Sequence, residues 1–424
     1  MKRQIPLRKS ALFLPSLLAP MLLSAAPSNG SESFILLSNP KFNGEIRPRY
    51  ESVDDSSTAS GSVANAMTVR AVLGLEAQLL GISGLSGKVE GTTVQSIDGE
   101  HYYSVTNSRS STEYDTIADP EQSRITQAYL QYKLGKTTAK VGRQIINIDN
   151  QRFVGSVDWR QMPQVFDAAV ISDNTIDALS LTGAYVWGRD LAINNNPTSK
   201  TNSLILNGSY KVSDMVKITA YDYMISSASD TIGISLTGTI PIAGAKVDYR
   251  AEYASQGDAS RDTDNLPANQ DVQADAYYYN LDLKANINGL IAGAGYEFLS
   301  GTTTTDGKTK FQTPLATLHA FNGWADKFLA TPTGGLKDTS LTLGYGTQTL
   351  GKAMIIYHDF ATDVAMGGKS DLGNEWDLLY TNAIPGVKGL NGLVKAAFYN
   401  AGDINPTTTY ADTDKIWLQL DYKF

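Results

Sequence analysis

Apolar and polar side chains alternate over long stretches of the chain, and this period of two constrains the fold more than any other feature. In the last stretch, Ile416, Leu418 and Leu420 would lie on one face of a strand, with Trp417 and Gln419 on the other. The same alternation recurs in residues 68–79, 246–253 and 277–286. Such a period predicts β-strands with two unlike faces.

These segments are about ten residues long, twice the usual length of strands in globular sheets. Little helix is predicted that could cover an open sheet. We count about eighteen segments, an even number, as a closed antiparallel barrel in a bacterial membrane requires. The predicted starts lie near residues 44, 67, 85, 124, 138, 164, 177, 203, 216, 230, 245, 276, 290, 340, 353, 375, 391 and 415.

The connections test this prediction independently, because an outer-membrane barrel has short turns at one end and long loops at the other. Short links follow the even-numbered segments, at 134–136, 173–177, 212–215, 242–245, 286–289 and 349–352. Long links follow the odd-numbered ones, at 54–65, 98–122, 146–163, 189–201, 255–274, 301–338, 362–373 and 402–414, with 226–229 as the short exception. The sequence therefore predicts an all-β transmembrane antiparallel barrel with short periplasmic turns and long extracellular loops.

The first 26 residues read as a signal peptide: four basic residues, an apolar run over 11–23 and small residues before a cleavage site near Ala25 or Ala26. The run is too short for a membrane-spanning helix and is broken by Pro15 and Pro20. Its removal takes four positive charges and no acids, which changes the net charge from −8 to −12. Residues 27–424 are then the barrel, expected in the outer membrane of a Gram-negative bacterium.

Several function classes are disfavoured by the composition. The net acidity suggests no nucleic-acid partner, and the absence of cysteine excludes thiolate metal sites and cysteine nucleophiles. The three histidines, His101, His319 and His358, have no patterned serine beside them, no zinc-type histidine pair occurs, and no GxSxG motif is present. His358 is expected at the rim or in the aromatic girdle. We predict no enzyme and no cofactor.

Barrel size carries the functional prediction, because the inside of an 18-stranded barrel is too wide for wall side chains to fill. It must hold water, a plug or inward-folded loops, and the predicted inward faces are charged rather than apolar. Inward charges either pair across strands and stiffen the wall or form a selectivity region for the solute. The candidates on predicted strands are Arg47, Arg49, Arg70, Lys246, Asp248, Arg250, Glu252 and Lys284.

The most distinctive segment, residues 141–168, is rich in arginine and aromatic residues. Val141 continues an outward face, so Arg143 would point to lipid unless a bulge or the upper rim intervenes. The loop beyond either folds into the lumen or packs on the rim. Its further candidates are Arg152, Asp158, Arg160 and Asp167.

Four separated motifs carry a resemblance over nearly the whole mature chain: residues 141–168, RPRYESVDD (47–55), NAMTVRAVLGLEA (65–77) and LHAFNGWADKF (318–328). Together they resemble the alginate-export family of outer-membrane porins. The resemblance implies an 18-stranded barrel with an arginine-rich lumen that moves anionic sugars or other small solutes. The matching positions are Arg47, Arg49, Arg70, Arg143, Arg152 and Arg160.

The connection 301–338 is too long for a plain connector, and its His319, Trp324 and Phe328 suggest either a lid or carbohydrate platform, or tight packing. The aspartates of the predicted loops are expected to solvate them or to bind divalent ions with lipopolysaccharide. The terminal Phe424 resembles the closing signal that the barrel-assembly machinery reads. We therefore predict a channel for small hydrophilic solutes, anionic or carbohydrate, with a non-conducting receptor or adhesin as the alternative.

Overall fold

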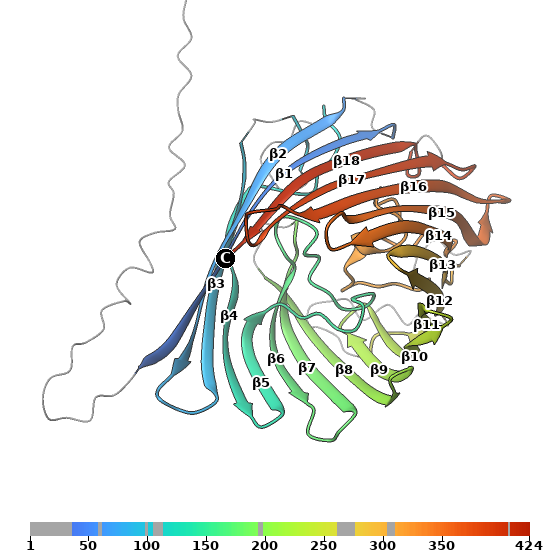
Figure 1. The fold of residues 1–424 in the computed structure, drawn as a ribbon. Helices are drawn as coiled ribbons and strands as arrows, with labels where there is room; N and C mark the ends of the chain where they lie inside the picture. Colours follow the sequence, from blue (N-terminus) through green and yellow to red (C-terminus); the bar gives the residue numbers. More distant parts are fainter. Residues whose placement is uncertain are drawn as a thin grey trace, which may run out of the picture.

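The computed structural model describes residues 36–57, 62–97, 101–104, 113–193, 198–260, 276–302, 310–405 and 408–424. Within these ranges eighteen antiparallel strands follow one another around a single sheet, and the first pairs with the last. The sheet therefore closes into a ring (Figure 1). This confirms the predicted all-β barrel; the predicted signal peptide, residues 1–26, lies outside the described residues.

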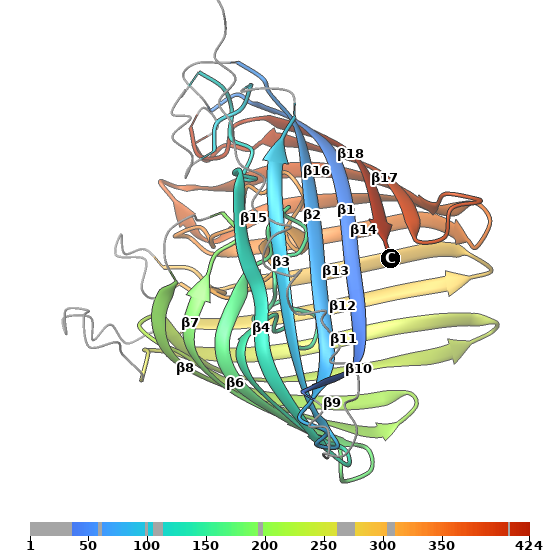
Figure 2. The same cartoon turned by 90° about the vertical axis from the view of Figure 1, so that its left-hand side faces the viewer.

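Most strands begin within three residues of the predicted positions, while β1, β8, β14 and β16 begin earlier. The strands are tilted relative to the axis of the barrel (Figure 2). Their bounds are β1 Leu37–Asp55, β2 Ala64–Leu79, β3 Leu85–Ser96, β4 Gln122–Leu134, β5 Thr137–Gln144, β6 Val165–Asp173, β7 Leu179–Asp190, β8 Ser199–Ser213, β9 Val216–Ile225, β10 Ser229–Ile242, β11 Ala245–Gly257, β12 Ala276–Ile287, β13 Leu290–Leu299, β14 Leu336–Thr347, β15 Gly351–Met366, β16 Lys369–Ala383, β17 Leu390–Ala401 and β18 Thr413–Lys423.

The two faces of the wall differ as the alternation predicts. In β18, Ile416 and Leu418 are 42% and 47% exposed on the outer face, whereas Trp417 between them is fully buried inside. In β12, Leu281 is exposed outside and Tyr278 is buried inside. An outer face of apolar side chains is the face that lipid requires. In the described part of the chain no helix is long and apolar enough to cross a membrane.

Short turns and long loops also separate by end, with one correction. The predicted loop 362–373 is wrong: β15 runs to Met366, β16 starts at Lys369, and only Gly367 and Gly368 connect them. Both glycines have positive φ, +61° and +81°, as a two-residue hairpin turn demands. Short links follow the even-numbered strands, and we call the end of the barrel where these links lie the turn end. This end is periplasmic in outer-membrane barrels. We call the opposite end the loop end.

The seam between β1 and β18 explains why the last strand keeps its pattern to its final residue. Gly44 and Phe424 exchange two backbone hydrogen bonds, of 2.9 and 3.1 Å. The Phe424 ring lies directly over Gly44, where a Cβ atom would come within 2.3 Å of it. The glycine makes room for the terminal aromatic ring, and the pairing removes the open sheet edge.

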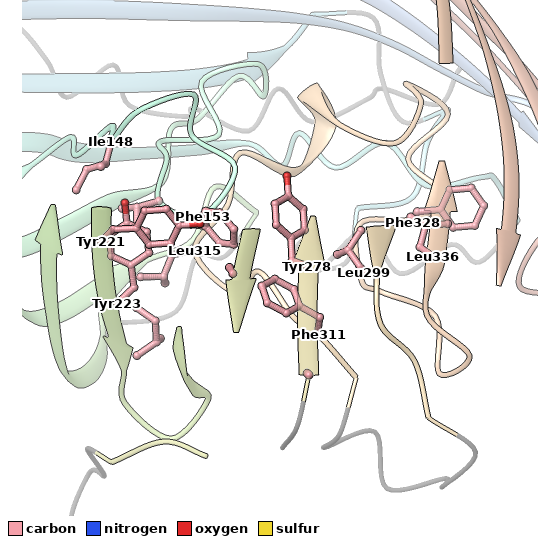
Figure 3. Packing of buried hydrophobic residues seen from close by; sticks show 14 of the residues in the cluster. Ile148, Phe153, Tyr221, Tyr223, Tyr278, Leu299, Phe311, Leu315, Phe328 and Leu336 are labelled. Carbon is pink, nitrogen blue, oxygen red and sulfur yellow. The ribbon is translucent and has the colours of Figure 1, made fainter. Parts of the chain in front are cut away.

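The inside of the barrel is not uniformly polar, which corrects the expectation of charged inward faces. An apolar cluster of buried residues occupies the loop-end half of the lumen, where Phe153 and Leu315 lie near Tyr221, and Tyr278 near Phe311 (Figure 3). Phe153 comes within 5.3 Å of the ring centres of both Tyr221 and Tyr278. Residues outside the strands thus supply an internal core.

Candidate functional site

Two segments at the loop end fold back into the ring (Figure 1): the β5–β6 loop, residues 145–164, and residues 310–335 of the β13–β14 loop. The strands β5 and β6 have only 8 and 9 residues, so their loop leaves the wall low and turns inward. Val154 and Leu315 form a parallel bridge between the two loops. Gly155 allows this approach, because its Cβ would lie 2.2 Å from Thr317 Oγ1. Folding into the lumen is therefore the confirmed alternative for the β5–β6 loop.

Arg152 anchors the β5–β6 loop to the wall at β12 and β13. Its Nε lies 2.7 Å from Glu297 Oε1, its Nη2 donates to Asn322 Oδ1 at 3.0 Å, and Tyr278 donates to the same carboxylate at 2.8 Å. The side chain is 3% exposed. Burial works against its charge, but Glu297 outweighs burial and raises the pKa of Arg152.

Arg160 makes the second anchor, at β1, six strands around the ring from β13. It binds Glu51 of β1 at 3.0 Å and Asp326 of the β13–β14 loop at 2.8 Å. Asp326 also binds Lys415 of β18 at 3.0 Å. Burial opposes the charge of Arg160, yet Glu51 and Asp326 outweigh it and raise the pKa of the guanidinium. Arg152 and Arg160 bind strands that lie apart on the ring, β13 and β1, so the loop crosses part of the lumen between them.

Asp158 brings two predicted wall arginines to the same loop. It lies 2.7 Å from Arg70 Nη1 and 3.9 Å from Arg47 Nη2. Both arginines also contact Glu45, at 3.0 Å from Arg47 and 3.2 Å from Arg70. Burial would raise the pKa of Asp158, but Arg70 and Arg47 lower it below its ordinary value. These arginines hold the loop by charge pairs.

Trp159 lies at the centre of the second anchor. The Arg49 guanidinium lies 4.3 Å from its ring centre and the Lys395 ammonium 4.1 Å from it. The Lys395 ammonium also lies 3.7 Å from the ring centre of Trp324. Contacts of this kind stabilise a cation on an aromatic face. Lys395 was not named from the sequence, although alternation predicts its inward position: it lies on the same buried face of β17 as Ala397.

His319 connects the Lys395 ammonium to the Asp326 carboxylate of the second anchor. Its ring stacks on Trp159, with 4.6 Å between ring centres and 5° between planes. Its Nδ1 lies 2.6 Å from Asp326 Oδ1 and its Nε2 lies 2.6 Å from Lys395 Nζ. Burial lowers the pKa of His319 well below 6.5, so the ring is neutral, donates through Nδ1 and accepts at Nε2.

The β13–β14 loop is therefore a packed element. His319 and Phe328 are 4% and 6% exposed, and Trp324 is half-buried against the apolar cluster. Of the two alternatives for predicted connection 301–338, this burial favours tight packing over a lid or an open carbohydrate platform.

Arg143 and Asp167 lie apart from these groups. They are paired with each other across β5 and β6. Arg143 lies on the same face of β5 as Val141, which is 49% exposed on the outer face. Arg143 binds Asp167 at 2.8 Å and Asp190 at 2.8 Å, at the loop end of the wall. The pairing of β5 is regular from Val141 to Arg143, so of the two alternatives the position at the rim holds and a bulge in β5 does not; the bulge observed nearby lies in the β6–β7 pairing, at Asp167. The pair joins neighbouring strands and does not meet the inward loop anchors.

The remaining predicted charges lie on β11 and β12. Arg250 binds Asp149 of the β5–β6 loop at 2.6 Å and Glu252 at 2.8 Å. Glu252 also accepts from Tyr221 at 2.8 Å. Asp248 is paired across the strands with Lys284. Lys246 is exposed near the turn end.

Open space lies below the inward loops, toward the turn end. One cavity of about 680 Å³ is bordered by Asp248, Lys284 and Lys352. A second, of about 380 Å³, lies against β5 to β9 and is bordered by Lys140 and Lys217. The charged groups that border these cavities are mostly lysines, whereas the arginines of the anchors are buried.

His358 corrects another expectation, because it lies inside the wall and not in the rim or girdle. It is 9% exposed, and its Nδ1 lies 2.8 Å from Asp338 Oδ1. Asp377 lies 3.7 Å from its Nε2. Within the described ranges no group of three or more metal-ligating side chains could hold a metal ion.

Solved structures with a similar fold include a porin and an outer-membrane protein. The chain superposes on OccAB3 of Acinetobacter baumannii with a TM-score of 0.72 and 15% identity, covering 91% of this chain and 99% of that one. A BenF-like porin from Pseudomonas fluorescens Pf-5 gives a TM-score of 0.71 at 15% identity, with 92% and 99% covered. OpdK of Pseudomonas aeruginosa, solved with vanillate, gives 0.71 at 11% identity, with 92% and 99% covered.

At these identities the solved structures establish the fold. The comparison with curated proteins returned no match. The family model described as "Alginate export" matches residues 40–300, from β1 through β13. With its closed 18-stranded outer-membrane barrel and this match over more than half of its length, the chain belongs to the alginate-export family.

Proposed function

We propose that the protein is an outer-membrane channel for small hydrophilic solutes, that it prefers anions or acidic carbohydrates, and that the β5–β6 loop forms its constriction. The observation that carries this proposal is the loop itself, which is fixed to β1 on one side and to β13 on the other through Arg160 and Arg152. An 18-stranded ring is too wide for its wall side chains to close, so a loop fixed across it sets the width of the path.

The preference for anions is supported by the groups that face open space. Lys140, Lys217, Lys284 and Lys352 border the two turn-end cavities. The predicted lumen arginines instead bind buried carboxylates, so we assign them mainly to shaping the constriction. An excess of one sign, here four lysines against Asp149 and Asp248, biases which ions pass, and the family description supports an acidic carbohydrate as the solute class.

Conductance of the refolded protein in a planar lipid bilayer tests the proposal. We expect discrete current steps and, in a potassium chloride gradient, a reversal potential that favours chloride. Complete absence of current at all voltages would leave the non-conducting receptor or adhesin as the better function. A cation-selective current would remove the anion preference and leave the channel.

The membrane partners follow from the outer surfaces. Phe424, at the β1–β18 seam, is 62% exposed, which suits contact with the barrel-assembly machinery during closure. Acidic residues at the loop end, among them Asp54 and Asp414, suit divalent-ion bridges to lipopolysaccharide. We propose both partners on these grounds.

A further inference from the structure

One stretch of the inner wall between β5 and β9 is divided into two rows of different chemistry. In the upper row, Val170 of β6 pairs with Ala184 of β7, and Ala184 pairs with Ile205 of β8. Ala184 and Ile205 belong to the apolar cluster together with Ile146 and Ile148 of the β5–β6 loop, and Val170 packs against it. The upper row therefore seats the inward loop.

The next row toward the turn end carries hydroxyl and amide groups instead, and we call it the hydroxyl row. The strand register places its four members side by side on β5, β6, β7 and β8: Thr138, Ser172, Thr182 and Asn207. Below it, Ser180, Ser209 and Thr219 are in register on β7, β8 and β9. Small polar side chains on five adjacent strands make a shallow, hydrogen-bonding wall.

This hydroxyl row borders the cavity of about 380 Å³, and residues 144–149 of the β5–β6 loop border the same space. A volume of this size lies at the lower end of the range of small-molecule sites, about 300–1,000 Å³. Tight packing uses apolar side chains, so a row of hydroxyl groups facing open space is poorly suited to hold the loop. It is well suited to bind a hydroxylated solute, because each hydroxyl both donates and accepts.

Two lysines flank the cavity and supply positive charge. Lys140 on β5 lies over the Tyr129 ring, 4.9 Å from its centre. Lys217 on β9 is 43% exposed and lies at the long distance of 3.9 Å from the carboxylate of Asp149, which already binds Arg250 at 2.6 Å. The two ammonium groups are therefore far less neutralised than Arg152 and Arg160, which are buried against carboxylates.

We propose that this cavity is a solute-binding site, separate from the constriction, for a small carboxylate that carries several hydroxyl groups. Lys140 or Lys217, which lie four strands apart at the two sides of the cavity, binds the carboxylate, and the hydroxyl row between them binds the hydroxyl groups. The inference rests on the proposed channel function and adds to it the residues that select the solute. A neutral polyol lacks the charge for the lysines, and a simple carboxylate has no hydroxyl groups to bond the hydroxyl row, whose Ser172 and Thr182 then bond only each other, at 3.2 Å.

Block of single-channel current by three probes added from the turn end tests the site. Gluconate has both the carboxylate and the hydroxyl groups, sorbitol has the hydroxyl groups alone, and propionate has the carboxylate alone. We expect gluconate to block at the lowest concentration. Equal block by all three probes would overturn the proposal, because neither half of the site would then contribute.

Variants separate the two halves of the site. The double substitution Lys140→Gln with Lys217→Gln should weaken gluconate block about tenfold or more, the size expected when hydrogen bonds to a charged group are lost. Thr182→Val should weaken block by gluconate and leave block by propionate unchanged. The matched control, Lys136→Gln with Lys388→Gln, removes two exposed lysines from the β4–β5 and β16–β17 turns that border neither cavity and should change gluconate block less than twofold.

The failure of this inference is distinguishable from that of the channel function. A conducting Lys140→Gln, Lys217→Gln channel that gluconate blocks as strongly as it blocks the wild type overturns the site and leaves the channel. A wild-type protein without conductance overturns the channel, and calorimetric titration of gluconate into the refolded barrel then decides the site. Binding that the double substitution abolishes supports the site, and no heat of binding in the wild type overturns it.

Discussion

The two halves of the lumen use positive charge in opposite ways. In the loop-end half, the Arg160 side chain is 9% exposed and lies between Glu51 and Asp326. In the turn-end half, Lys217 is 43% exposed and lies 3.9 Å from the carboxylate of Asp149. Arg160 is thus compensated by buried carboxylates, and Lys217 is the more exposed of the two cations, as the proposed solute site requires. The number of basic residues in a barrel therefore says little about its selectivity until their partners are known.

The difference has an electrostatic cause. A charge that is taken out of water must be compensated by a partner in good geometry, and removal of one partner leaves the other buried and uncompensated. Charges that border water need no such partner, and their pairs are individually weak. Substitutions should therefore affect stability and loop position in the first half, and solute binding in the second.

Arg160→Ala is expected to have the largest effect. It leaves Glu51 and Asp326 buried without this cation, at a cost of about 3–5 kcal/mol to the free energy of unfolding. The β5–β6 loop loses its anchor on β1, so single-channel conductance should rise. Urea unfolding in detergent micelles and conductance of the same variant measure both effects.

The matched control for this change is Lys136→Ala, which breaks the exposed ion pair with Asp177, where the two side chains are 59% and 94% exposed. It should change the unfolding free energy by less than about 1 kcal/mol. If Arg160→Ala behaves like this control in both measurements, the loop is not held by its buried charges.

Acid should loosen the β13–β14 loop in two stages. Burial lowers the pKa of His319 well below its ordinary 6.5. For Asp326, burial works in the opposite direction, but His319, Lys415 and Arg160 outweigh it and hold the pKa well below 3.8. Both groups bind protons more readily when released, so their stabilisation is complete above the ordinary values and is lost as pH falls. We expect more frequent open-state fluctuations below about pH 6.5, and more again below about pH 3.8.

Current recordings across this pH range test the expectation. His319→Gln keeps a neutral hydrogen-bonding side chain and should remove the first stage, while the second stage remains. His101→Gln, at an exposed position, should leave both. Current noise that does not depend on pH between 7 and 3 would show that neither group contributes to loop position.

Arg143→Gln should have the smallest effect. Its pair with Asp167 lies in the wall at the loop end, and its side chain is 22% exposed, so solvent screens the interaction. We expect a loss of about 1 kcal/mol in unfolding free energy and no change in conductance or reversal potential. A shifted reversal potential would place Arg143 among the groups that the permeating ion meets.

Much of the architecture could be predicted because its signals are local. A strand with lipid on one side and the lumen on the other alternates with period two, and so β9, β11, β12 and β13 begin at the predicted residues. The β15–β16 hairpin was missed although its signal, Gly367-Gly368 between alternating residues, is local too. The site was predicted less completely. Asp158 and its partners Arg70 and Arg47 were all named as candidates. Arg152 and Arg160 were named too, but their partners Glu297, Glu51 and Asp326 were not.

The sequence by itself determined the closed ring. Alternation and strand length are properties of neighbouring residues, and the even strand count follows when these local segments are added along the chain. Only the tertiary structure decided which charges are free. Glu297 is 145 residues from Arg152 in the chain, and Glu51 is 109 residues from Arg160. Such pairs exist only after the ring has closed and the loop has turned inward, so no local pattern reports them.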